Sequence, residues 1–197
     1  TLNGECPEFE LRFKDTDVVC LQEVNDIGAT YSLIDKLHSN YCHFYYNIGP
    51  VAAPGVVAQN SGLFVASKYK LENPNFVPFA RGKGLQRVVN KGFFDCDVVA
   101  NDKKMAHVIT THLSPSDNDL KPEEEEEIAR KNALALIVGR IKDICSSKKE
   151  DYPIALVGDM NLSRQLREYK SIMQSKIFTD PYNNDNGVDI NNATCAT

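Results

Sequence analysis

The chain has 197 residues, with 42% hydrophobic and 25% charged residues and a net charge of −5. This length suits one domain with a sizeable core, and the acidic balance argues against a protein that gathers nucleic acid through a general positive field. No apolar run approaches the roughly 20 residues of a membrane span, so we expect a soluble protein without a transmembrane segment, either cytoplasmic or secreted.

The first half of the chain alternates short apolar runs with one amphipathic stretch. The amphipathic stretch, residues 29–37, carries apolar side chains at helical spacing and predicts a helix. Residues 70–74, which include an Asn-Pro pair, predict a turn. The apolar runs that predict strands are residues 17–24, 61–67, 87–89 and 92–99.

The second half opens with a predicted hairpin and continues with a long helix. A polar tip at 101–104 separates the strand 92–99 from a further strand at 107–113. Proline at position 122 and the acidic run that follows it suit the first turn of a helix, predicted over 122–144. Its expected apolar stripe consists of Ile128, Leu134, Ile137, Val138, Ile141 and Ile144.

The apolar run 155–157 predicts a buried strand that stops at Gly158. Asp159 and Asn161 follow, two positions apart. If the backbone stays extended there, both side chains leave the strand on one face. An acid and an amide at the end of a buried strand suit the binding of water, metal or phosphate better than the filling of a core.

Two other strand ends carry polar groups of this kind. Gln22-Glu23 ends the first strand, and Thr111-His112 ends the second strand of the hairpin. Strand ends are where α/β folds assemble their sites. Carboxylate and amide oxygens are ligands for Mg²⁺, with Mn²⁺ or Ca²⁺ as alternatives, and a histidine can face negative charge. The set is typical of metal-assisted attack of water on a phosphate ester.

These motifs resemble a known superfamily. The strand ending in Gln22-Glu23, then Thr111-His112-Leu113, then Gly158-Asp159-Met160-Asn161, occur in the order found in the endonuclease/exonuclease/phosphatase superfamily. The glycine-led strand ending in Ser67-Lys68 also resembles its central strand. Asn90-Lys91-Gly92 and Arg130 resemble its neutral sphingomyelinase-like branch.

The resemblance implies an α/β (α+β) fold, a four-layer α-β-β-α sandwich of the deoxyribonuclease I-like type. It implies that Glu23 is the magnesium ligand and that His112 contacts the scissile phosphate. It also implies that Asp159 orients or activates the attacking water and that Asn161 binds phosphate. The substrate would be a phosphate ester, a phospholipid or a nucleic acid, and no obligate protein partner is expected.

Two features of that superfamily have no counterpart in the sequence. Its members open with a strand that carries an active-site Asn and close with an Asp-His pair. We therefore expect residues 1–197 to be part of a single catalytic domain, incomplete at both termini. The expected function is a magnesium-dependent phosphodiesterase with sphingomyelinase-like character. The alternatives are a nuclease of the same fold and, from another class, an inactive binding module or gene fragment.

The other histidines, several basic residues and the cysteines are not assigned to the predicted site. His38, His43 and His107 lack a comparable context and are predicted to be structural. A scattered basic surface is the preferred interpretation of the basic residues that could otherwise line a groove: Arg81, Lys83, Arg87 and Lys91. The cysteines are widely and irregularly spaced and are expected to be mostly free thiols: Cys6, Cys20, Cys42, Cys96, Cys145 and Cys195.

Overall fold

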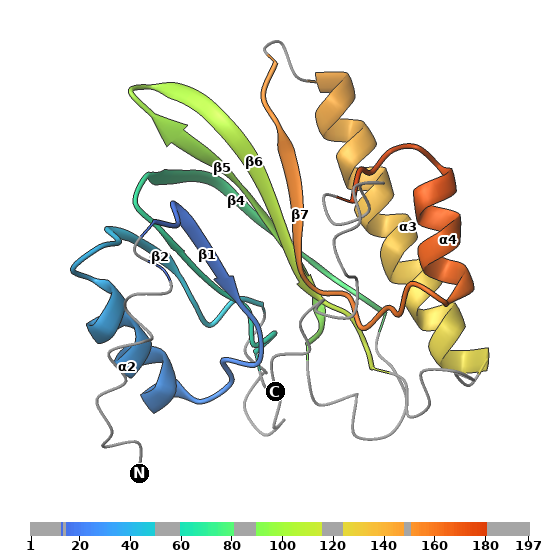
Figure 1. Ribbon diagram of the computed structural model, residues 1–197. Helices are drawn as coiled ribbons and strands as arrows, with labels where there is room; N and C mark the ends of the chain where they lie inside the picture. Colours follow the sequence, from blue (N-terminus) through green and yellow to red (C-terminus); the bar gives the residue numbers. More distant parts are fainter. Residues whose placement is uncertain are drawn as a thin grey trace.

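The computed structural model describes residues 13, 15–49, 60–80, 90–115, 124–147 and 151–180, which form two β-sheets packed between helices (Figure 1). Within these residues the first sheet has the order β1-β3-β2, and its neighbouring strands are antiparallel. The second has the order β4-β5-β6-β7, antiparallel except for the parallel pair β6 and β7.

The bounds of the strands are β1 Val18–Leu21, β2 His43–Tyr45, β3 Phe64–Ser67, β4 Lys70–Pro78, β5 Gly92–Ala100, β6 Lys103–His112 and β7 Ile154–Asp159. The bounds of the helices are α2 Ile27–Leu37, α3 Glu124–Ser147 and α4 Arg167–Gln174. In the described part of the chain, no helix is both long and apolar enough to cross a membrane.

Apolar side chains fill the spaces between the layers. One cluster, which includes Leu37 and Phe64, packs α2 against the first sheet. A second, which includes Val65 and Cys96, lies between the two sheets. A third, which includes Ile137, packs α3 and α4 against the second sheet. The layers therefore stack as helix, sheet, sheet, helix, which confirms the predicted deoxyribonuclease I-like sandwich.

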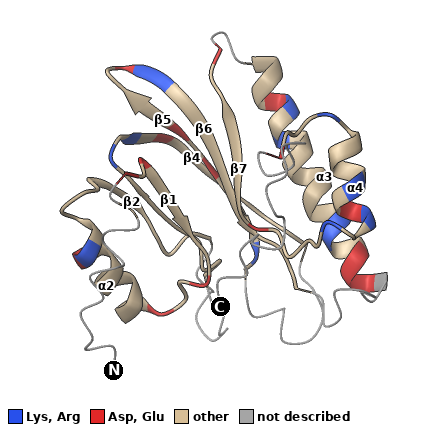
Figure 2. Cartoon of the chain, viewed as in Figure 1, with Lys and Arg blue, Asp and Glu red and all other residues tan. Residues whose placement is uncertain are grey.

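Local sequence explains several of these elements. The side chain of Asp26 accepts a hydrogen bond of 2.7 Å from the backbone N–H of Ala29 and so caps α2. β5 and β6 form the predicted hairpin, joined at Asn101 and Asp102, whose φ angles of 51° and 57° suit a tight hairpin turn. Figure 2 shows the predicted acidic first turn at the start of α3.

The structure differs from the sequence prediction at residues 70–74. They lie in β4, and the bend falls at 68–69 instead. Asn73 has a φ of 51°, and the pairing with β5 shifts register between Glu72 and Asn75. The Asn-Pro pair therefore produces a bulge in a strand at the edge of the described sheet, where a missing N–H is tolerated.

Other differences are smaller. Ile128, assigned to the buried stripe of α3, is 49% exposed, whereas Leu134, Ile137, Ile141 and Ile144 are buried. The short strand β2 and the helix α4 were not predicted. The predicted strand at 87–89 and the start of the predicted helix at 122–123 lie outside the described residues. Among the described cysteines, Cys20, Cys42, Cys96 and Cys145 form no disulfide.

A buried polar cluster joins the second sheet to α3. The Nδ1 atom of His107 lies 2.6 Å from Asp97 Oδ1, and its Nε2 lies 3.1 Å from Asp95 Oδ1. Arg140 of α3 donates to Asp95 Oδ1 at 2.7 Å. Asp95, Asp97 and His107 are all at most 3% exposed. The structure thus places His107, predicted to be structural, within a closed set of charged partners.

The hydrogen-bond partners of Asp95 determine the direction of its pKa shift. Burial by itself raises the pKa of Asp95, but hydrogen bonds from His107, Arg140 and Asn75 outweigh burial, and the net pKa falls below 3.8. A carboxyl whose pKa is depressed in the folded state adds stability above its unfolded pKa and loses that contribution as the pH falls.

We expect Arg140→Met to lower the free energy of unfolding at pH 7 by about 3 kcal/mol, because it leaves the buried carboxylate of Asp95 without its arginine. The deficit should shrink below about pH 3.8, where Asp95 becomes protonated in the unfolded chain and then in the folded chain. Urea unfolding at pH 7 and pH 3 measures both effects. Lys142→Met, on an exposed position of the same helix, is the control; equal stability of the two variants at pH 7 would contradict the assignment.

Candidate active site

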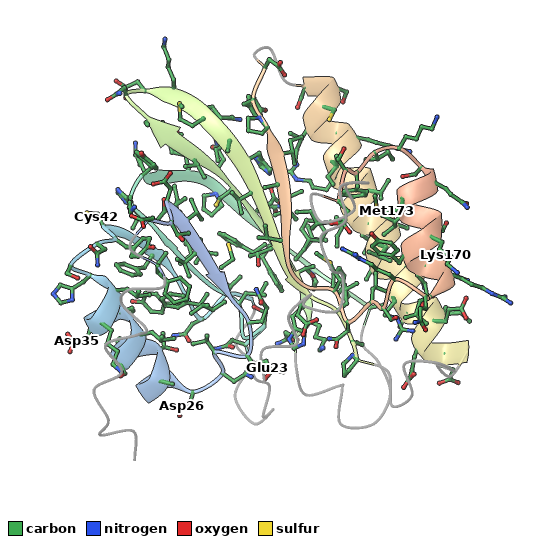
Figure 3. The ribbon with its side chains drawn as sticks, in the orientation of Figure 1. Glu23, Asp26, Asp35, Cys42, Lys170 and Met173 are labelled. Atoms are coloured by element: carbon green, nitrogen blue, oxygen red, sulfur yellow. The ribbon has the colours of Figure 1, made fainter. Side chains whose placement is uncertain are left out.

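The strand ends that carry the predicted site residues meet at one end of the sandwich. β6 and β7 run parallel and in register, so His112 is the pairing partner of Asp159. Glu23 follows β1 and lies at the same end, near the ends of β6 and β7 (Figure 3). The Nε2 atom of His112 is 3.9 Å from Glu23 Oε1 and 3.9 Å from Asp159 Oδ2. The fold therefore brings together three residues from distant parts of the sequence.

Asn161 joins this group after the strand has ended. Its backbone N–H donates to Asp159 Oδ1 at 2.8 Å, and its Nδ2 donates to the carbonyl oxygen of Leu113 at 2.8 Å. Its φ of 46° is in the left-handed region, which asparagine tolerates better than most residues. The condition of an extended backbone is thus not met, because β7 ends at Asp159. A turn, rather than strand alternation, places the amide beside the acid.

Two glycines allow the chain to approach closely at this end. Gly158 has a φ of 119°, and a Cβ added there would lie 2.1 Å from the carbonyl oxygen of Thr111. Gly62 has a φ of 70°, and its carbonyl accepts a 2.9 Å hydrogen bond from Val24, the residue after Glu23. Only a residue without a Cβ fits such positions without strain. The glycines therefore set the backbone that presents Asp159 and Glu23.

Lys91 is a site residue that the sequence did not select. It was grouped with a scattered basic surface, yet it is half-buried and donates a 2.7 Å hydrogen bond to the carbonyl oxygen of Leu113, which also accepts from Asn161. Burial lowers the pKa of Lys91 to about 8, although the nearby carboxylates of Asp159 and Glu23 oppose the shift. The side chain remains largely protonated at pH 7. The signal that could have found it is the Asn90-Lys91-Gly92 motif, which resembles the sphingomyelinase-like branch.

The surroundings of His112 lower its pKa and so favour the neutral imidazole. Burial is the largest cause of its lowered pKa, and the positive charge of Lys91 lowers the pKa further. Asp159 and Glu23 act in the opposite direction but do not reverse the shift. The imidazole can therefore accept a proton when new negative charge arrives beside it, since an added anion favours the charged form.

The donors at this site suit a magnesium ion better than a metal held by many side chains. Among the described residues, no group of three or more His, Cys, Asp or Glu side chains is arranged to hold a metal. Mg²⁺ does not require such a group, because it is commonly bound by one or two carboxylates and keeps several waters. The Glu23 side chain is 76% exposed and that of Asp159 is 52% exposed. The site contains the accessible carboxylates of Glu23 and Asp159 and the single ammonium group of Lys91. Its negative charges therefore outnumber its positive charge, which favours the binding of a cation.

The other residues considered from sequence lie elsewhere or are not described. His38 is exposed and its Nδ1 lies 2.5 Å from the backbone oxygen of Asp35, while His43 lies in β2. Arg81, Lys83 and Arg87 fall outside the described residues.

Comparison with known proteins finds relatives with sphingomyelinase names. No protein-family model matches the chain. Sphingomyelinase C of Listeria ivanovii is 26% identical over 181 residues, which cover 86% of this chain and 52% of that protein. Sphingomyelin phosphodiesterase 5 of Danio rerio is 32% identical over 114 residues, covering 52% of this chain and 21% of that protein. The chain thus spans about half the length of its bacterial relative.

Solved structures share the fold. A Staphylococcus aureus beta toxin mutant, determined with bound magnesium ions, superposes with a TM-score of 0.72 and 24% identity. The superposition covers 86% of this chain and 60% of the toxin chain. At this identity the likeness establishes the fold, and the roles of individual residues depend on the geometry described above.

We expect Gly158→Ala to destabilise the protein by about 2 kcal/mol or more, because alanine is strained at positive φ and its Cβ would meet the Thr111 carbonyl. Gly139→Ala in α3 is the matched control, since a Cβ there meets nothing within 4 Å and should stabilise the helix by about 0.5–1 kcal/mol. Denaturant unfolding compares the two. Equal tolerance of both alanines would show that the close approach of β7 to β6 is absent.

We expect Lys91→Met to raise the pKa of His112, because it removes the positive charge that disfavours the imidazolium. An NMR titration of the His112 ring in chelator-treated protein measures the shift without any assay of activity. Lys170→Met is the control, since Lys170 is exposed on α4 and far from Glu23 in Figure 3. An unchanged His112 pKa in the Lys91 variant would remove Lys91 from the site.

Proposed function

We propose that the chain is a member of the endonuclease/exonuclease/phosphatase superfamily and contributes to a magnesium-dependent phosphodiesterase acting on a phospholipid, as its sphingomyelinase-like relatives suggest. Residues 1–197 would form part of one catalytic domain. The observation that carries the proposal is the convergence of Glu23, His112 and Asp159, with both carboxylates 3.9 Å from the imidazole.

In this proposal Glu23 anchors the metal ion, and its exposed carboxylate supports that role. A bound Mg²⁺ would offset the negative charge of the phosphate oxygens and of the leaving oxygen. Asp159 would accept a hydrogen bond from the attacking water and orient it toward phosphorus. Both carboxylates are accessible enough for water and substrate to reach them.

The nitrogen-bearing groups would bind the substrate phosphate. Asn161 uses one of its two amide hydrogens on Leu113 and keeps the other for a phosphate oxygen. Lys91 adds a positive charge. A phosphate beside His112 would raise the pKa of the imidazole, so that the ring takes up a proton. The protonated ring would then donate a hydrogen bond to the oxygen on which negative charge develops during hydrolysis.

The phospholipid is favoured over a nucleic acid for two reasons. The relatives reported above carry sphingomyelinase names, and the net charge of −5 gives no general attraction for a polyanionic strand. A nuclease of the same fold and a binding module without activity are the competing outcomes of the assay below.

We expect the purified chain with Mg²⁺ to hydrolyse a choline phospholipid in preference to a DNA duplex or an inositol phosphate. Glu23→Gln and Asp159→Asn should each lower kcat by at least about 100-fold, since each removes a charge needed at the reacting centre. EDTA should abolish turnover, and Mg²⁺ should restore it, with Mn²⁺ and Ca²⁺ as comparisons.

Asp35→Asn is the matched control, because Asp35 is an exposed acid on α2 that lies away from Glu23 in Figure 3. Its activity should equal that of the parent. Cleavage of DNA alone would identify a nuclease. A folded chain that hydrolyses none of the substrates would favour the binding module.

A further inference from the structure

A fully buried ion pair joins α3 to α4. Arg130 donates from Nε and from one terminal nitrogen to the same carboxylate oxygen of Glu168, at 3.2 Å and 3.0 Å. Both side chains are 0% exposed. Glu168 lies in the first turn of α4, the helix that follows the segment carrying Asn161. The pair is therefore an internal tie between α3 and the chain that leaves the candidate active site.

The pair is poorly suited to a purely stabilising role. The second terminal nitrogen of Arg130 and the second oxygen of Glu168 are buried and have no hydrogen-bond partner among the described residues. Burying two charges is costly, and incomplete hydrogen bonding leaves part of that cost uncompensated. Apolar residues of similar size often replace a buried ion pair with no loss of stability. An effect other than stability accounts better for these two charges.

The segment between β7 and α4 is held at several points. Asn161 donates to the Leu113 carbonyl at its start. Met160 and Leu162 pack against the cluster of apolar side chains beneath α3. At its end, Leu166 is buried and its N–H donates to the Ser163 carbonyl at 3.0 Å. Glu168 comes two residues later and supplies the directional contact with α3.

Apolar packing alone would fix this segment loosely, because it has no preferred direction, whereas two hydrogen bonds to one carboxylate oxygen define an angle as well as a distance. A rotation of α4 on α3 would be passed back along the few residues that separate Glu168 from Asn161. We propose that Arg130 and Glu168 are positioning residues, whose buried ion pair sets the register of α4 and so the placement of Asn161. The part of this inference that concerns turnover rests on the proposed function.

The test replaces the pair with apolar residues of similar size, as Arg130→Met combined with Glu168→Leu. The melting temperature should stay near that of the parent or rise. Amide hydrogen exchange at Asn161 and Leu166 should become at least about tenfold faster, because the segment gains alternative positions. The kcat/KM for the phosphodiester should fall about 10- to 100-fold, since misplacement of Asn161 disturbs the reacting geometry.

Two further variants separate positioning from simple damage. Arg130→Lys keeps the charge but loses the two-donor geometry, so it should give an intermediate increase in exchange without global unfolding. Glu127→Met with Lys131→Leu removes a salt bridge on the same helix whose partners are not both buried, and it should leave exchange at Asn161 unchanged.

The two readouts keep this inference separate from the proposed function. If the parent protein turns over no phosphodiester, the exchange rates of Asn161 and Leu166 still decide the role of the pair. Unchanged exchange at both amides in a folded Arg130→Met, Glu168→Leu variant would overturn the inference. So would faster exchange spread evenly over the whole chain, which would indicate a general loss of stability.

Discussion

The parallel pairing of β7 with β6 is the constraint on which the candidate site depends. Antiparallel strands would place His112 and Asp159 at opposite ends of the sheet, whereas the parallel register makes them neighbours. A parallel neighbour requires a long crossover, which α3 provides, and α3 then covers the outer face of the sheet. The close approach at Gly158 completes the junction. Helix, strand order and site geometry thus follow from one pairing.

The sequence predicted the features that depend on local pattern. Apolar runs ending in Glu23, His112 and Asp159 located the strand ends, because buried strands are bounded by a change to polar residues. The hairpin of β5 and β6 was predicted because its polar tip separates two apolar runs. The sandwich itself came from the order of these motifs, and the structural relatives confirm it.

The features that the sequence did not predict depend on tertiary contacts. Residues 70–74 look like a turn by composition, and pairing with β5 holds them in β4. Lys91 belongs to a motif found in the sequence, but only the fold shows that its Nζ donates to the carbonyl oxygen of Leu113. Arg130 and Glu168 are charged residues on amphipathic segments, and no local rule predicts that both become fully buried. In each case a partner distant in sequence decided the outcome.

The candidate site is divided between the two sheets, since Glu23 follows a strand of the first and His112 and Asp159 belong to the second. The apolar layer between the sheets, which includes Val65 and Cys96, therefore sets the distance between the two parts of the site. Protein interiors are packed so tightly that the loss of a single methylene affects the surrounding groups. The volume of these remote, chemically inert side chains is thus a determinant of the separation between carboxylate and imidazole.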